Sequence, residues 1–159
     1  MQTMDFDHIW KSIAAGLCGS AAHSGLMALK SWLGILPTFQ PYDNLQMLLT
    51  ALVGNSVDPM VPWVLSFFNG SVVLGFLFGH FYQRLPGRTG IMKGMLFGFA
   101  VWIAMSVTFF PAIGKGLFAA QTELGIAPTF FTLAMVLTYS VTLGIAYSLF
   151  TSQTRGRAT

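Results

Sequence analysis

Residues 90–110 read GIMKGMLFGFAVWIAMSVTFF, an apolar run in which Lys93 is the one charged residue. The hydrocarbon core of a bilayer is about 30 Å thick, and a helix that rises about 1.5 Å per residue crosses it with about 20 apolar residues. This run is long enough to do so. Similar stretches lie on both sides of it, at about residues 12–36, 62–82 and 128–151.

The composition agrees with a chain that lives in lipid. Hydrophobic residues make up 54% of the 159 residues and charged residues only 8%, whereas a soluble domain is about 25% charged. In lipid the backbone must satisfy its own hydrogen bonds, which leaves helices or a closed barrel. Continuous runs such as residues 95–104 lack the alternation of barrel strands. We therefore expect one all-α integral membrane domain with four transmembrane helices.

The connections between these helices differ in length. Pro86-Gly87 marks a tight turn between the second and third helices. The other two connections are longer, and each holds a short amphipathic segment, at about residues 44–54 and 115–124. These segments are too short to span a bilayer, so we expect short interfacial helices. Each half then reads helix, proline, amphipathic segment, glycine, proline, helix, which predicts two tandem hairpins.

The basic residues predict the orientation. Six of them flank one set of helix ends: Lys11, Arg84, Arg88, Lys93, Arg155 and Arg157. Lys30 and Lys115 lie toward the other side, and Lys30 is expected to reach the headgroups there. Because basic residues are retained in the cytoplasm, both termini are expected to be cytoplasmic. Lys11, Arg84, Arg88 and Lys93 are expected to contact anionic lipid headgroups. The net charge of +3 is too scattered to predict a nucleic-acid partner.

Small residues recur at the spacing that lets membrane helices approach closely. The glycines concerned are Gly19, Gly75, Gly79, Gly90, Gly94 and Gly98. Helices in lipid associate largely through close contact at such residues. The stripe on residues 90–98 predicts packing within the chain, docking to another subunit, or both. Asn69-Gly70-Ser71 interrupts the second helix and is expected to hydrogen-bond to another helix.

Two histidines, His23 and His80, are the main candidates for chemistry. Motifs of hydrolytic or phosphoryl-transfer enzymes are missing, so we expect no catalysis. Either histidine is a candidate axial ligand of a haem or a chlorophyll. The two would lie about 16 Å apart in depth, too far for one haem between them. Alternatively, His23 hydrogen-bonds a neighbour such as Ser20, Ser24 or Asn69, and His80 lies at the interface near Tyr82 and Arg84.

Two longer stretches carry a resemblance: AAGLCGSAAHSGLMALKSWLGILP, residues 14–37, and GFLFGHFYQRLPGRTGIMKGMLFGFAVWIAMSVTFFPAIGKG, residues 75–116. They resemble a group of small, uncharacterised bacterial four-helix membrane proteins. That group has a glycine-rich first helix, a histidine near the end of the second helix and a Gly-x-x-x-Gly third helix that closes with proline. The resemblance implies a multi-pass protein of the bacterial inner membrane and brings no assigned activity.

Three functions follow as hypotheses. The first is a non-catalytic accessory or structural subunit that packs against other membrane proteins or against copies of itself in the lipid bilayer. The second is a haem- or chlorophyll-binding protein that uses His23 or His80. The third is a small oligomeric transporter or channel, for which four helices with so few buried polar groups form a poor path alone.

Overall fold

The computed structural model describes residues 6–155, and these form five helices and no strand. The first two are α1 (Phe6–Trp32) and α2 (Pro41–Val53), and the last two are α5 (Gly90–Ala112) and α6 (Ala127–Arg155). Between them lies one continuous helix, called the second span, which consists of α3 (Met60–Phe68), the π-helical η1 (Asn69–Leu74) and α4 (Gly75–Phe81). Four of them, all except α2, are long and apolar enough to cross a membrane. The chain is accordingly a multi-pass membrane protein in architecture.

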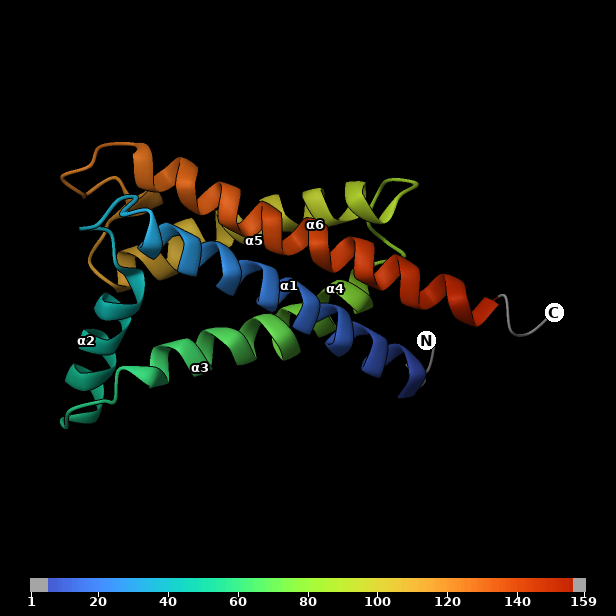
Figure 1. Ribbon diagram of the computed structural model, residues 1–159, viewed down its shortest axis with the longest axis horizontal. Coiled ribbons are helices and arrows are strands. Elements are labelled where there is room, and N and C mark those ends of the chain that lie inside the picture. Colours follow the sequence, from blue (N-terminus) through green and yellow to red (C-terminus); the bar gives the residue numbers. More distant parts are fainter. Residues whose placement is uncertain (1–5, 156–159) are drawn as a thin grey trace.

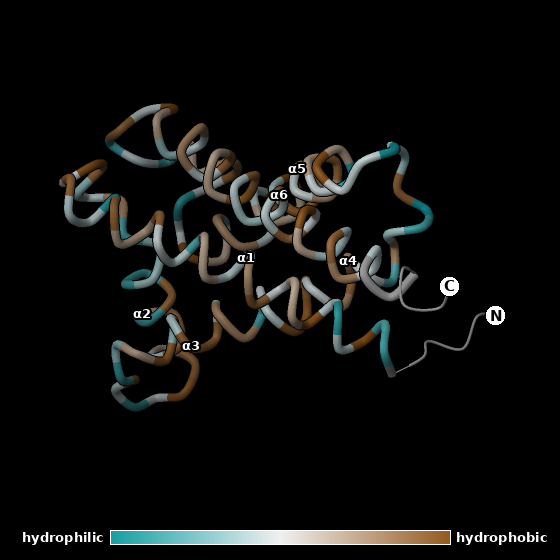
Figure 2. The backbone as a smooth tube through the Cα atoms, turned by 45° about the vertical axis from the view of Figure 1, so that its right-hand side comes forward, coloured by the Kyte–Doolittle hydropathy of each residue, from teal (hydrophilic) through white to brown (hydrophobic). Residues whose placement is uncertain are grey.

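The four long helices run along the long axis of the molecule (Figure 1). The start of α1, the end of α6 and the turn between α4 and α5 lie at one end of the bundle, while α2 and the connection between α5 and α6 lie at the other. Hydrophilic colour is strongest in the connections, including the turn between α4 and α5 (Figure 2). This arrangement places the polar segments where the headgroups of a bilayer would be.

Helices α1 and α6 form the centre of the bundle. They pack against each other, α5 packs on α6, and η1 and α4 pack on α1. An aromatic cluster fills the centre near the α4–α5 turn, where the buried Phe78 ring lies 5.2 Å from Phe97 and 5.7 Å from Tyr147. A second cluster at the opposite end contains Phe39 and Phe110, whose ring centroids are 6.2 Å apart.

The observed helix bounds differ most from prediction in α1, which spans 6–32 rather than 12–36. The helix begins early because its first turn is held by side chains: Lys11 pairs with Asp7, and Ser12 Oγ donates to the carbonyl of His8 at 2.7 Å. It ends early because Gly34 adopts the left-handed conformation, with φ of 64°. The other three spans lie within a few residues of their expected bounds. Arg157, used in the orientation argument, lies outside the described residues.

The two longer connections are not alike. The first contains α2, which starts with Pro41 at its first turn and ends at Gly54, with φ of 76°. The expected interfacial helix at 115–124 was wrong, since that connection holds only the three-residue 3₁₀ helix η2 (Leu117–Ala119). Gly116, Phe118 and Ala119 all have positive φ, between 55° and 72°. Consecutive residues in that region cannot continue a right-handed helix.

Candidate functional site

The glycines of α5 lie directly against α6. A Cβ atom added at Gly94 would be 3.0 Å from the Ser140 carbonyl carbon and 3.2 Å from Val141 Cα. Gly90 meets Gly144 in the same way, and a Cβ at Gly98 would be 2.7 Å from Ser140 Cβ. Close backbone contact therefore requires glycine here. The glycine stripe on residues 90–98 packs against α6 of the same chain.

The other predicted glycines lie where α1 meets its neighbours. A Cβ at Gly19 would be 2.8 Å from the Tyr139 ring, and one at Gly75 would be 2.7 Å from the Ser12 carbonyl oxygen. Gly79 faces the Ser12 side chain and lies 3.4 Å from the Tyr147 ring by the same measure. These glycines let α1 approach the second span and α6 closely.

The π-helical segment of the second span carries a buried polar contact. Tyr139 Oη on α6 donates a hydrogen bond to the carbonyl of Gly70 at 2.6 Å. Ser71 Oγ lies 3.1 Å from Ser20 Oγ on α1. The Gly70 carbonyl also accepts the backbone N–H of Gly75, which is the five-residue spacing of a π-turn. The Asn69–Ser71 interruption thus hydrogen-bonds to two other helices, through Gly70 and Ser71.

His23 belongs to a second polar cluster, which joins three helices near the α2 end. Its Nε2 lies 3.3 Å from Tyr42 Oη on α2, and that hydroxyl lies 3.1 Å from Ser66 Oγ on α3. The Tyr42 ring also packs on Trp63, with centroids 4.3 Å apart. Met135 on α6 offers its backbone to the imidazole as well. The partners of His23 are therefore Tyr42 and the Met135 backbone, and not Ser20, Ser24 or Asn69 as predicted.

Tyr42 is the hub of this cluster, and its charge state is fixed by its surroundings. Burial raises the pKa of the Tyr42 hydroxyl above its ordinary value, and the hydrogen bond with Ser66 opposes that rise only in part. The hydroxyl therefore stays protonated at neutral pH. It can donate one hydrogen bond while it accepts another.

His80 lies in a separate environment, exposed near the α4–α5 turn. Its Nε2 is 3.3 Å from Arg84 Nη1, and its ring lies 6.4 Å from Phe76 and 5.0 Å from Phe81. Arg84, Phe76 and Phe81 are not among the residues of the cluster around His23 and Tyr42. Among residues 6–155, no group of three or more His, Cys, Asp or Glu side chains could hold a metal ion.

The predicted headgroup ligands have different surroundings. Lys11 was expected to contact lipid headgroups, but it is buried, with 7% exposed, and its ammonium pairs with Asp7. The early start of α1 explains this, because Lys11 then lies inside the helix and faces the bundle. Lys93 Nζ donates to the Tyr82 carbonyl at 2.7 Å and lies 4.2 Å from the Tyr82 ring centroid. Arg84 and Arg88 are exposed.

Comparison with protein families gives one match, which covers residues 6–158. The chain belongs to DUF6789, a family of unknown function. No curated protein and no solved structure matches it.

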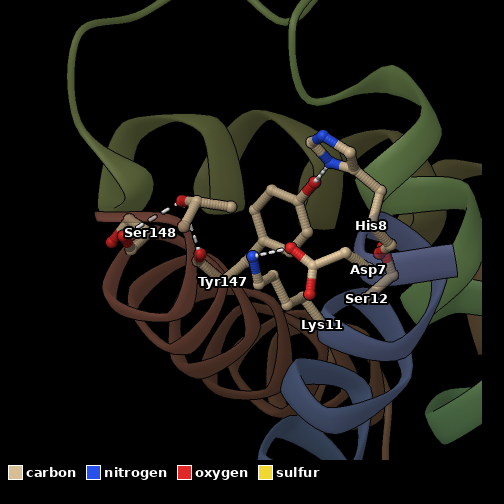
Figure 3. Close-up of polar contacts among 7 residues, drawn as sticks. Asp7, His8, Lys11, Ser12, Tyr147 and Ser148 are labelled. Carbon is tan, nitrogen blue, oxygen red and sulfur yellow. Dashed lines mark hydrogen bonds and ion pairs between the residues drawn. The ribbon is translucent and has the colours of Figure 1, made fainter. Parts of the chain in front are cut away.

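Sequence reasoning missed one histidine of this DUF6789 chain. His8 Nδ1 lies 3.4 Å from Tyr147 Oη on α6, beside the ion pair of Lys11 and Asp7 (Figure 3). His8 falls outside the predicted first span, which begins at residue 12. If α1 is taken to begin before residue 8, the four-residue spacing of His8 and Ser12 places both side chains on one helix face. That spacing is the signal that could have identified His8.

Proposed function

We propose that the chain is a non-catalytic accessory subunit of the bacterial inner membrane that packs against another membrane protein through α3. Its two hairpins are α1 with the second span, and α5 with α6, and both termini are cytoplasmic. The observation that supports this proposal is the exposure of α3 on nearly every side.

Helix α3 has little packing of its own within the chain. The elements that it contacts most are α2 and the adjoining η1. Its one buried residue is Pro62, and Ser66 is half-buried. The remaining seven positions are exposed, and the large apolar side chains among them include Val64 at 60% and Phe68 at 56%. An apolar helix whose large side chains are this exposed has little of the packing on which membrane helices depend.

The cofactor hypothesis receives less support from the same geometry. An axial ligand needs a free ring nitrogen aimed at the metal. The Nε2 of His23 is occupied by Tyr42 and that of His80 faces Arg84. A transporter path is also weakly supported, because the polar clusters hydrogen-bond internally. Packing against a partner requires no rearrangement of these contacts.

The test is site-specific photo-crosslinking in cells that produce the full chain. A benzophenone side chain replaces Phe67 on α3 in one variant and Phe99 on α5 in the other. The two phenylalanines are 42% and 50% exposed and both lie in membrane spans, so they form a matched pair. We expect a discrete protein adduct from position 67 and only lipid adducts from position 99.

Three outcomes would contradict the proposal. Lipid adducts alone at position 67, or equal protein adducts at both positions, would remove α3 as the docking surface. An adduct with the mass of two 17.3 kDa chains would replace the accessory role with self-association.

A further inference from the structure

We propose that a groove at the α2 end of the bundle, between α1 and α3, binds the anionic headgroup of a membrane amphiphile, with Lys30 as the cationic partner. The groove adjoins α3 through Trp63, but the proposal does not depend on a protein partner of α3. It rests on a buried cation, on the groove beside that cation and on the tryptophans that line it.

Lys30 is a buried cation without an ion pair. Only 3% of it is exposed, and its Nζ donates to the Phe39 carbonyl at 2.7 Å. Among the described residues the one ion pair within 4.0 Å joins Lys11 and Asp7, so Asp43 attracts Lys30 only from a greater distance. An ammonium has three donors, and Phe39 takes one. Lys30 was expected to reach the headgroups, and it is instead covered by the α1–α2 connection, whose Phe39 carbonyl accepts from its Nζ.

Lys30 forms part of the wall of a groove of about 470 Å³. Polar groups come from Lys30, Ser31 and Gln40, and apolar surface comes from Ala28, Trp32 and Trp63. Ligand pockets commonly measure about 300–1,000 Å³ and combine an apolar wall with a few polar groups. A groove of this size is larger than an inorganic phosphate needs.

The position of the groove favours an amphiphile over a free anion. It lies where two spanning helices end, at Trp32 of α1 and near the start of the second span at Met60. Tryptophans are enriched at this level because their rings suit the boundary between acyl chains and headgroups. Trp32 is 82% exposed and Trp63 is 38% exposed, so both rings can contact an acyl chain. A phosphate or carboxylate on that chain would accept the free donors of Lys30.

The experiment measures quenching of Trp63 fluorescence by lipids in detergent solutions of the full chain. The probes are phosphatidylglycerol and phosphatidylcholine with the same acyl chains, brominated near the carbonyl end. Subtracting the signal of the matching Trp63→Phe variant isolates Trp63. We expect half-maximal quenching at about tenfold less phosphatidylglycerol than phosphatidylcholine, since a charge-assisted hydrogen bond contributes a factor of about ten or more.

Two variants and one control decide the assignment. Lys30→Gln should lower the lipid preference to about one. Lys115→Gln makes the same charge change at the same end, but Lys115 lines a different cavity, so the preference should stay within about twofold. Ala28→Phe fills the groove from an exposed position that tolerates a larger side chain, and it should remove the preference without a change of charge.

The proposal is overturned if Ala28→Phe keeps the full lipid preference. This test does not depend on whether Lys30→Gln folds. Equal loss in Lys30→Gln and Lys115→Gln would also overturn it, because general surface charge would then explain the preference. Inorganic phosphate at the same concentration as the lipid is the final arm. If it abolishes the preference, the site takes a free anion and not an amphiphile.

Discussion

Replacing Gly94 with alanine tests how closely α5 and α6 must approach. The added Cβ would be 3.0 Å from the Ser140 carbonyl carbon and 3.2 Å from Val141 Cα, and closer still to the Ser140 carbonyl oxygen. These are backbone atoms, so no side-chain rotation can relieve the contact and the two helices must separate. Gly25→Ala on α1 is the matched control, because nothing lies within 4 Å of a Cβ there.

The expected magnitude follows from two opposed effects. Alanine has a higher helix propensity than glycine by about 1 kcal/mol, and both variants gain it. Overpacking in a close-packed interface costs about 1–3 kcal/mol, and only Gly94→Ala incurs that cost. The propensity gain cancels in the difference between the variants. We therefore expect Gly94→Ala to be less stable than Gly25→Ala by about 1–3 kcal/mol.

The assay is equilibrium unfolding of both full-length variants in mixed detergent micelles, followed by tryptophan fluorescence. One contributor is Trp102, which lies on the same helix as Gly94 and contacts Thr132 of α6. If the two variants unfold at the same denaturant fraction, the close contact between α5 and α6 does not exist and the packing order of the bundle is refuted.

Three further predictions concern the polar clusters. Tyr139→Phe removes the buried hydrogen bond to Gly70 and should lower the free energy of unfolding by about 0.6–1.7 kcal/mol in the same micelle assay; an unchanged value would mean that the bond is not formed. Tyr42→Phe removes the link between α2 and α1, so amide hydrogen exchange in α2 should accelerate about fivefold while exchange in α6 stays constant. The purified chain should show no Soret or chlorophyll absorbance, and a band that disappears in His23→Ala or His80→Ala would restore the cofactor hypothesis and displace the hydrogen-bonding role described here.

The spans could be predicted from sequence because their signal is local. Length and apolar composition place residues 90–110 in a helix without knowledge of any neighbour, and the observed helix is Gly90–Ala112. The start of α1 was missed because hydropathy weakens before residue 12. What extends that helix is side-chain bonding within its first turns, between Asp7 and Lys11 and from Ser12.

The candidate site could be predicted only in part. His23 was identified as a polar group at depth, but its partner Tyr42 lies 19 positions away on a helix whose placement the sequence does not reveal. Ser20, about one turn away on α1, was a natural alternative, yet Ser20 bonds Ser71 instead. Similarly, Lys30 was identified as a charge in an apolar run, and its burial depends on how the loop at Phe39 folds back.

Substitution data across residues 60–81 should not fit a single helical wheel. Hydrogen bonds in η1 close over five residues instead of four. Between Phe68 and Gly75 the second span therefore holds about one residue more than a regular α-helix of the same rotation would. Deleting one residue from that segment would let a regular helix form, and the missing turn of about 100° would be offset by the loss of the extra residue that η1 accommodates. Phe78 would then keep its direction into the aromatic cluster, so a one-residue deletion within η1 should do less harm than a one-residue deletion in the α-helical residues just before or after it.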